Sequence, residues 1–282
     1  MVGLATIGLA AALLVAQDTD TTFAAAGATQ IEVSGAAGSV VVRAWDRDEI
    51  RVVAEHARST EIEIRRRADA WRIGTERRWG GGIADYEITV PRGYDVTVGG
   101  MYFSLDVEGV GGAVEAQSIE GDMRIVGGRG DVDLNAINGR VTVEESEGTI
   151  HLKSAAESME LRALAGEVMV EAIGGNVTLS EMSASKVEVR SVGGNVRYEG
   201  VLSPGGEYVL SSHGGNITVQ IPEGTNADVW VATVMGNIDV DLPGVAEVGE
   251  GRRREFRLGT GGAELDLETF GGRISLRRTG AR

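Results

Sequence analysis

Apolar residues recur at a fixed spacing through the middle of the chain. Gly112, Gly121, Gly130, Gly139 and Gly148 are nine residues apart, and the units that they begin read Gly-x-Φ-x-Φ-x-small-Φ-x, where Φ is apolar. The second offset holds Val114, Met123, Val132, Val141, Ile150, Met159, Val168, Val177, Val187 and Val196. The third and fifth offsets are mostly polar. Alternation with period two predicts one strand per unit, with one buried face and one solvated face.

A single unit cannot be stable by itself. Burial of its two main apolar side chains contributes about 3–6 kcal/mol, whereas ordering nine backbone residues costs about 9–18 kcal/mol. Stacked units share a continuous core, which is how solenoids are stabilised. We therefore expect an all-β fold, a single-stranded β-solenoid (β-helix) with about two nine-residue strand units per coil, closed by short β segments.

A longer repeat accompanies the shorter one. Asn176, Asn195, Asn216 and Asn237 each follow Gly and precede Val or Ile, at spacings of 19, 21 and 21 residues. These spacings are close to two units, so we expect one coil to contain two strands and one stacked asparagine. Asparagine tolerates left-handed backbone geometry, and stacked amides can hydrogen-bond along a solenoid axis. The four residues are predicted to form a structural asparagine ladder rather than a ligand site.

The same patterns divide the chain into segments. We expect a signal-like leader at 1–16, a linker at 17–30, an N-terminal β region continuous with the solenoid at 31–98, solenoid repeats at 99–242 and C-terminal strands that form a cap at 243–282. The flanking segments retain short alternating runs, and no helix is predicted after the leader. The expected role of the flanks is to cover strand edges at the two ends.

The leader indicates an address outside the cytoplasm. Residues 3–16 (GLATIGLAAALLVA) are apolar and uncharged, and polar residues follow at once. The run is shorter than the ~20 residues of a spanning helix and fits the apolar part of a signal peptide. No Lys or Arg precedes it, which is unusual for a signal peptide. We expect a periplasmic, envelope or surface location, with the leader either cleaved or kept as an anchor.

Composition narrows the list of partners. The 282 residues include 42 Gly, no Cys and only 5% aromatic residues, and the formal net charge is −15. Nucleic acids and anionic membranes would repel such a chain. The absence of cysteine excludes disulfides and cysteine-based metal sites. Because aromatic residues are so few, the core must be aliphatic. Any partner is expected to be an envelope or surface protein or a glycan.

Three segments resemble a known group of proteins. They are residues 38–42 (GSVVV), residues 86–98 (YEITVPRGYDVTV) and residues 269–276 (TFGGRISL), together with the Gly-Gly-Asn-Val/Ile repeats. With these motifs the chain resembles the bacterial putative-adhesin family of β-strand-repeat proteins, a domain of unknown function of β-solenoid type. The resemblance covers roughly residues 31–278. It implies a β-solenoid with an envelope or surface address, and it brings no catalytic residues.

Candidate chemical sites have simpler structural explanations. Residues 127–134 (GGRGDVDL) approach a calcium-binding nonapeptide, but Val132 occupies the place of the ligand aspartate. The tripeptide Arg129-Gly130-Asp131 is expected to be an exposed turn, and the sequons at Asn176 and Asn216 lie in the corner pattern. His56, His151 and His213 are scattered. No catalytic, cofactor-binding or metal-binding residues are predicted.

Two classes of function remain open. The first is a non-enzymatic extracytoplasmic scaffold or adhesin-like binding module of the envelope or surface. The alternative is a glycan-binding or glycan-cleaving β-helix protein, which should show a groove with convergent carboxylates.

Overall fold

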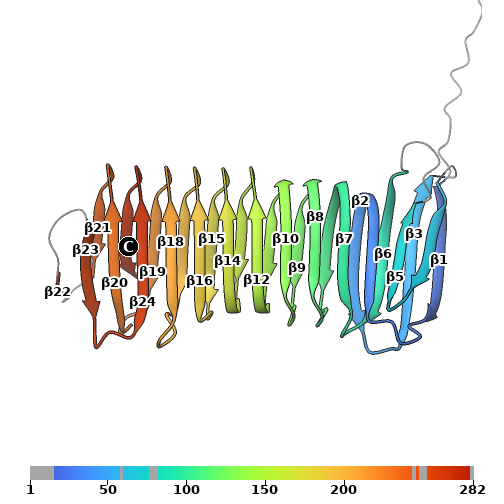
Figure 1. The fold of residues 1–282 in the computed structure, drawn as a ribbon, viewed down its shortest axis with the longest axis horizontal. Coiled ribbons are helices and arrows are strands. Elements are labelled where there is room, and N and C mark those ends of the chain that lie inside the picture. The colour runs from blue at the N-terminus through green and yellow to red at the C-terminus, as the bar shows by residue number, and fades with distance from the viewer. Residues whose placement is uncertain (1–15, 58–59, 76–81, 243–245, 248–252, 280–282) are drawn as a thin grey trace, which may run out of the picture.

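A computed structural model describes residues 16–57, 60–75, 82–242, 246–247 and 253–279 of the chain. The described residues form β-strands and turns without any helix, so the all-β prediction is confirmed. Figure 1 shows an elongated stack of coils in which each coil contributes one strand to each of two layers. The described residues contain no helix long and apolar enough to cross a membrane.

The central coils follow sequence order. One layer contains β8 (Val114–Glu120), β10 (Val132–Asn138), β12 (Glu147–Ser154), β14 (Ala165–Ala172), β16 (Lys186–Ser191) and β18 (Glu207–Ser212). The other contains β9 (Met123–Val126), β11 (Val141–Glu144), β13 (Met159–Arg162), β15 (Val177–Met182), β17 (Val196–Gly200) and β19 (Ile217–Ile221). Val132 pairs in parallel with Val114 on one side and with Ile150 on the other. Each of these neighbours is two nine-residue units away, as the repeat predicts.

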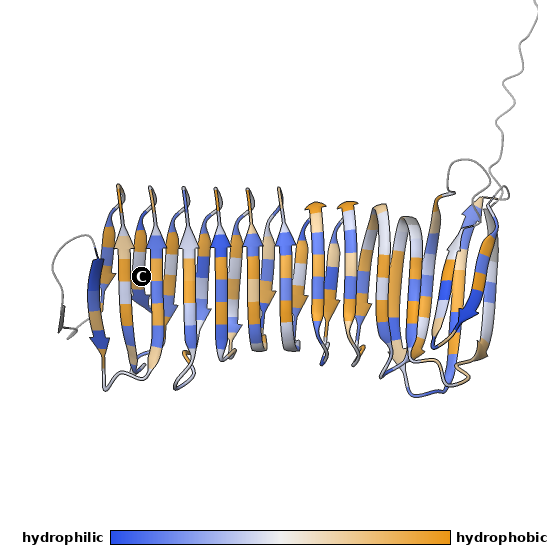
Figure 2. Cartoon of the chain, in the orientation of Figure 1, coloured by the Kyte–Doolittle hydropathy of each residue, from blue (hydrophilic) through white to orange (hydrophobic). Residues whose placement is uncertain are grey.

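The core lies between the two layers. The predicted inward residues of the second offset are all at most 1% exposed: Val132, Val141, Ile150, Val168, Val177 and Val196. Hydrophilic and hydrophobic residues alternate along the strands in Figure 2 as the period of two requires. The later coils are longer and hold the buried Tyr198 and Tyr208, whose rings meet edge-to-face with centroids 5.8 Å apart.

At the N-terminal end the coils leave sequence order. Strand β2 (Gln30–Trp45) forms a whole coil and pairs on one side with β7 (Asp95–Glu108), which continues to β8 and β9. On its other side β2 pairs with β5 (Ala70–Thr75) and β6 (Ala84–Pro91). The coil of β5 and β6, which follows β2 in sequence, therefore lies on the outer side of β2, and β7 lies on the inner side.

Antiparallel strands cover the outer edge of this end. Strand β3 (Glu49–Ala57) pairs with β6, β1 (Ala16–Ala24) pairs with β3, and β4 (Ile62–Arg67) pairs with β5, all antiparallel. Their pairing satisfies backbone groups that an open coil would expose. Strand β1 lies in the segment 17–30 that was expected to be a linker. Its polar sequence gives little alternation, and pairing with β3 makes it a strand. Residues 1–15 of the expected leader lie outside the described residues.

The C-terminal end also departs from sequence order. Strands β24 (Ala263–Thr269) and β25 (Ile274–Arg278) pair with β18 and β19 on one side. On the other side they pair with β20 (Ala227–Thr233) and β21 (Ile238–Asp241). The coil of β20 and β21 is thus displaced outward by one position, and the last coil of the chain fills the gap.

The segment 243–282, expected to form a cap, therefore divides into two parts. Strand β23 (Arg253–Leu258) runs antiparallel along the outer edge of β20, and β22 (Ala246–Glu247) pairs antiparallel with β23. These strands cover one layer of the C-terminal end. Strands β24 and β25 belong to the stack itself, because both of their edges are paired.

The shared core predicts cooperative unfolding. Val168 is fully buried, and a carboxylate there would lie unpaired among aliphatic side chains. We expect Val168→Asp to lower the midpoint of thermal unfolding by roughly 10 °C or more, or to abolish folding. Met169→Asp, on the outward side of the same strand, is the matched control and should change the midpoint far less. Circular dichroism melting measures both, and a Val168→Asp protein with an unchanged midpoint would contradict the common core.

Candidate binding surface

One corner of the solenoid forms where the first strand of each coil ends. The last inward side chain there is small, and successive coils place these residues in register: Ser118, Ala136, Ser154, Ala172, Ser191, Ser212, Thr269 and Thr233. Several of their hydroxyls brace the turn that follows. The Gly215 amide donates to Ser212 Oγ at 2.9 Å, and the Gly272 amide donates to Thr269 Oγ1 at 3.1 Å.

The residue after each small one points outward and is usually apolar. We call this row the apolar edge. In spatial order it comprises Met101 and Tyr102, Ile119, Ile137, Ala155, Ile173, Val192, His213, Phe270, and Val234 and Met235. Among the described residues, 11 large hydrophobic side chains are exposed, and all but Ile83 and Val201 belong to this edge. Over nine coils at ~4.8 Å each, the edge is about 38 Å long.

The edge is held by backbone hydrogen bonds from coil to coil. The Ile173 amide donates to the Ser154 carbonyl at 3.1 Å, and the His213 amide donates to the Ser191 carbonyl at 3.0 Å. The rings of His213 and Phe270 stack, with centroids 4.9 Å apart and planes 7° from parallel. The apolar side chains are therefore displayed at fixed positions.

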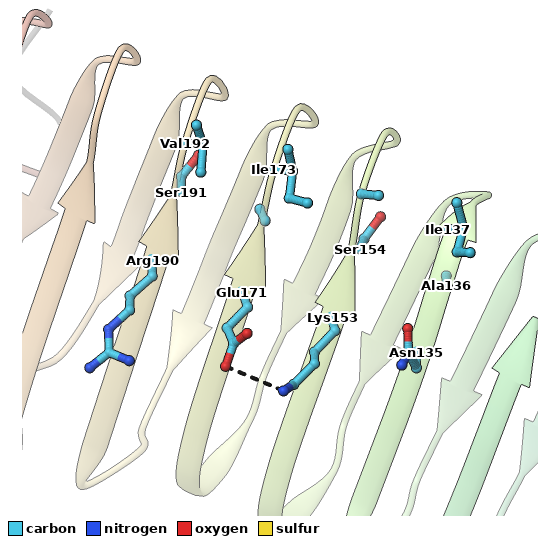
Figure 3. Close-up of a pocket in the computed structure, with 12 residues that line it drawn as sticks. Asn135, Ala136, Ile137, Lys153, Ser154, Glu171, Ile173, Arg190, Ser191 and Val192 are labelled. Atoms are coloured by element: carbon cyan, nitrogen blue, oxygen red, sulfur yellow. Dashed lines mark ion pairs between the residues drawn. The ribbon is translucent and has the colours of Figure 1, made fainter. Parts of the chain in front are cut away.

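A shallow groove of about 420 Å³ runs beside the edge over four coils. Figure 3 shows the residues that line it: Ile137, Ile173 and Val192 lie near the turns, and Lys153, Glu171 and Arg190 lie lower on the strands. Lys153 Nζ and Glu171 Oε1 form an ion pair at 3.5 Å. The groove thus has an apolar wall and a wall of mixed charge.

Glycines make the corner tight. A Cβ on Gly194 would collide with the carbonyl oxygen of Gly175, and one on Gly215 would collide with that of Gly194. The same close approach continues through Gly272 and Gly236. Glycine is required at these positions because the backbones of neighbouring coils touch there, and not because the backbone adopts a left-handed conformation. The Gly-Gly-Asn repeat therefore marks a line of backbone contact along the solenoid.

The asparagines lie next to this line and bond between coils. Oδ1 of Asn176 accepts hydrogen bonds from the backbone amide of Asn195 at 3.0 Å and from its Nδ2 at 3.1 Å. Asn195 Oδ1 accepts the Asn216 amide at 2.9 Å, and Asn216 Oδ1 accepts the Arg273 amide at 2.8 Å. All of these side chains are exposed yet engaged.

Asn237 is placed differently from the other three. The 21-residue spacing suggested that it stacks directly on Asn216, but the coil of β25 lies between them, and Arg273 occupies the neighbouring position. The carbonyl oxygen of Asn237 accepts the Ile274 amide at 2.9 Å. The insertion of the last coil accounts for this difference, because it separates two turns that are adjacent in the repeat.

Except for His213, which belongs to the edge, the other sequence candidates lie apart from it. Arg129 and Asp131 are exposed at the turn between β9 and β10. Of the histidines, His56 is buried and lies 3.0 Å from Thr19 Oγ1, whereas His151 is half-buried on the outward side of β12. Across the described ranges no three His, Asp or Glu side chains gather as metal ligands. The sequence signal for the edge was the third Φ of the nine-residue unit, to which no role was given.

Acidic side chains on the faces are engaged by arginine. Glu144 Oε2 lies 3.0 Å from Arg124 Nη2, and Glu144 Oε1 lies 3.3 Å from Arg162 Nε. A hydrogen bond from Arg257 lowers the pKa of Asp228, and one from Arg92 does the same for the pKa of Asp46. These shifts run opposite to what a general acid requires.

Comparison with known proteins gives one family. The Toastrack DUF4097 family matches residues 28–276. No curated protein matches the chain.

Similar solved structures differ widely from this chain in sequence. They include a putative cell adhesion protein from Clostridium sporogenes ATCC 15579, at 11% identity and TM-score 0.31, covering 94% of this chain and 100% of that one. A putative adhesin from Bacteroides fragilis NCTC 9343 is 11% identical with a TM-score of 0.35, and the match covers 93% of this chain and 97% of that one. A putative lipid binding protein from Parabacteroides distasonis ATCC 8503 is 9% identical with a TM-score of 0.38, and the match covers 93% of this chain and 96% of that one. Similarity at this level carries no functional information.

The glycine contacts predict a sharp difference between neighbouring residues. Gly194→Ala should destabilise the fold by about 1–3 kcal/mol, because the new Cβ overlaps the backbone of the next coil. Gly193→Ala is the matched control, since its Cβ would stand 3.4 Å from the Ile173 carbonyl oxygen, an ordinary contact. Chemical denaturation measures both free energies of unfolding. Equal costs at the two positions would show that the coils do not touch at Gly194.

The asparagine bonds predict modest, graded effects. Asn195→Ala should lower stability by about 0.5–1.5 kcal/mol, because it removes the acceptor for the Asn216 amide and the donor to Asn176. Asn195→Asp should cost more, since it places a carboxylate against Asn176 Oδ1. The same denaturation experiment tests this order. An Asp variant as stable as the wild type would show that the hydrogen bond from Asn195 Nδ2 to Asn176 Oδ1 does not contribute to stability.

Proposed function

Because the chain belongs to the Toastrack DUF4097 family, we propose that it is a non-enzymatic, extracytoplasmic scaffold that binds a partner of the cell envelope or surface through its apolar edge. The family assignment agrees with the resemblance to bacterial putative adhesins seen in the sequence. The address rests on the apolar run at residues 3–16. The binding surface rests on the edge.

The distribution of exposed apolar side chains is the observation that carries this function. Scattered apolar residues are normal on a protein surface, but a continuous exposed row marks an interaction site. Ile173 is 60% exposed and Val192 is 54% exposed, while the flanking positions carry Lys, Glu, Arg and Asn. A partner that covers the row would remove several aliphatic side chains from water without burying the strongly acidic remainder of the chain.

Rigidity supports the same role. The edge is fixed by coil-to-coil hydrogen bonds and by glycine contacts, so little conformational entropy is lost when a partner binds. The engagement of Glu144, Asp228 and Asp46 by arginine supports a non-catalytic module.

A glycan ligand is the second candidate. The exposed Phe270 ring, stacked on His213, offers an aromatic face of the kind on which sugar rings pack. The remaining edge is aliphatic, and aliphatic rows suit a protein partner better.

Binding to cell envelopes tests the proposal. Fluorescently labelled chain is mixed with envelopes from the source organism, and the bound fraction is compared with that of Ile137→Ser/Ile173→Ser/Val192→Ser. We expect at least a tenfold weaker association, because three contact side chains lose most of their apolar area. Val201→Ser/Ile83→Ser, which alters the exposed hydrophobic residues away from the edge, should bind like the wild type.

Two results would contradict the proposal. One is undiminished binding by the folded triple variant, which would move the binding surface elsewhere. The other is the release of soluble glycan fragments from the envelopes by the wild-type chain, which would favour the glycan-cleaving alternative.

A further inference from the structure

Side chains along the apolar edge vary in size in a particular order. From Met101 to Phe270 the row contains large side chains except at Ala155, which is half-buried between Ile137 and Ile173. The row therefore has a notch near its middle, one coil wide, where the small side chain of Ala155 stands between two large ones. The most exposed aliphatic side chain of these coils, that of Ile173 at 60%, is the next one along.

The row beside the edge carries a matching order of charge. On the outward side of the same strands, successive coils place Asn135, Lys153, Glu171 and Arg190 in register. Figure 3 shows these side chains side by side below the apolar row, with Lys153 and Glu171 paired. The beginning of this row, Gln117, and its continuation, Ser211, are uncharged.

We propose that the edge binds the same edge of a second copy of this chain, antiparallel, about a two-fold axis that passes between the coils of Ala155 and Ile173. The inference rests on the proposed function in taking the edge as a binding surface, and it names the partner. A two-fold axis in the plane of contact and perpendicular to the solenoid reverses the order of coils while each row still faces itself.

In this arrangement the two rows are complementary to themselves. Each Ile173 fills the notch at the partner's Ala155, and Ile137 faces the partner's Val192. Lys153 faces the partner's Glu171, and Asn135 faces the partner's Arg190. Continuing outward, Ile119 meets His213, Met101 meets Phe270 and Gln117 meets Ser211, so no like charges face each other in either row.

Other arrangements of the two copies fit less well. In a parallel pair Ala155 would face Ala155 and leave a gap, while each Ile173 would meet another Ile173. An antiparallel pair shifted by one coil, which places Glu171 opposite Arg190, would set Ala155 against His213 and leave Ile173 without a notch. The proposed register is the one that satisfies both size and charge.

The contact is narrow, so the dimer should be weak. Two rows over eight coils are about 34 Å long, and their area lies below the ~800 Å² per partner of a standard interface. We expect a dissociation constant in the micromolar range, measurable by sedimentation velocity over a concentration series.

Cysteine cross-linking tests the register directly, because the chain has no cysteine of its own. Ile137→Cys and Val192→Cys are purified separately and then mixed under mild oxidation. The mixture should form the disulfide-linked dimer at least fivefold more than either variant alone. The control mixture of Ile137→Cys with Val201→Cys, which lies off the edge, should not. Strong linkage of Ile137→Cys to itself would show a parallel pair, and linkage to Phe270→Cys would show the shifted register; either result overturns the proposal.

A charge exchange gives a second, independent measure. Glu171→Lys should weaken the dimer at least tenfold, since two lysines then face each other twice. Lys153→Glu/Glu171→Lys should restore it, because the facing pair is the same with its signs reversed. In the shifted register the double variant would instead set the introduced lysine against Arg190 and fail to recover.

The outcomes separate this inference from the proposed function. A wild-type chain that stays monomeric and uncross-linked at several hundred micromolar overturns the dimer, even if the triple serine variant loses envelope binding. A dimer of the predicted register together with unchanged envelope binding by that variant keeps the inference and removes the edge from envelope attachment.

Discussion

Parallel hydrogen bonding between successive coils governs this structure. A central strand such as β12 gives one edge to β10 and the other to β14, and this pairing fixes both the distance between coils and their register. Because the register is constant, a residue at one offset always has the same offset above and below it. Inward Val and Leu become a core, Gly-Gly-Asn becomes a line of contact, and outward residues become rows. No coil has enough apolar area to be stable without its neighbours.

The same bonding creates a difficulty at the ends, where a strand would present unpaired amides and carbonyls. Antiparallel strands meet this need: β3, β1 and β4 cover the N-terminal coil, and β23 covers one layer of the C-terminal coil. At both ends one coil is also displaced outward from its place in sequence order, since β5 and β6 lie outside β2, and β20 and β21 lie outside β24 and β25. The chain thus passes to an outer position, covers the edge and returns, so that the end coils are held by strands distant in sequence.

Rows of outward side chains on the surface follow from this constant register. Most outward rows mix Glu, Arg, Thr and Asn, and their ion pairs between exposed side chains contribute little to stability. The apolar edge is the exception, since Ile, Val, Phe and Met lie exposed there, where they add nothing to the core. We propose that recognition explains a surface feature that repeats in coil after coil along this tightly packed corner. Its small residue Ala155 and the charges of Lys153 and Glu171 distinguish the middle of the row from its ends.

The sequence by itself determined the repeat, the inward residues and the two-strand coil. Period-two alternation and the nine-residue spacing are local properties, and Val132, Ile150 and Val168 had no alternative position once the strands formed. The tertiary structure decided the rest. Coils such as 227–241 and 263–278 carry nearly equivalent patterns, so local sequence cannot say which lies next to β18; the pairing of both edges of β24 does. It likewise placed Arg273 rather than Asn237 beside Asn216. The apolar edge was hidden for a related reason. The third Φ of the unit points outward at Ile173 but inward at Leu164 and Met182, because the chain bends differently at the two corners of a coil.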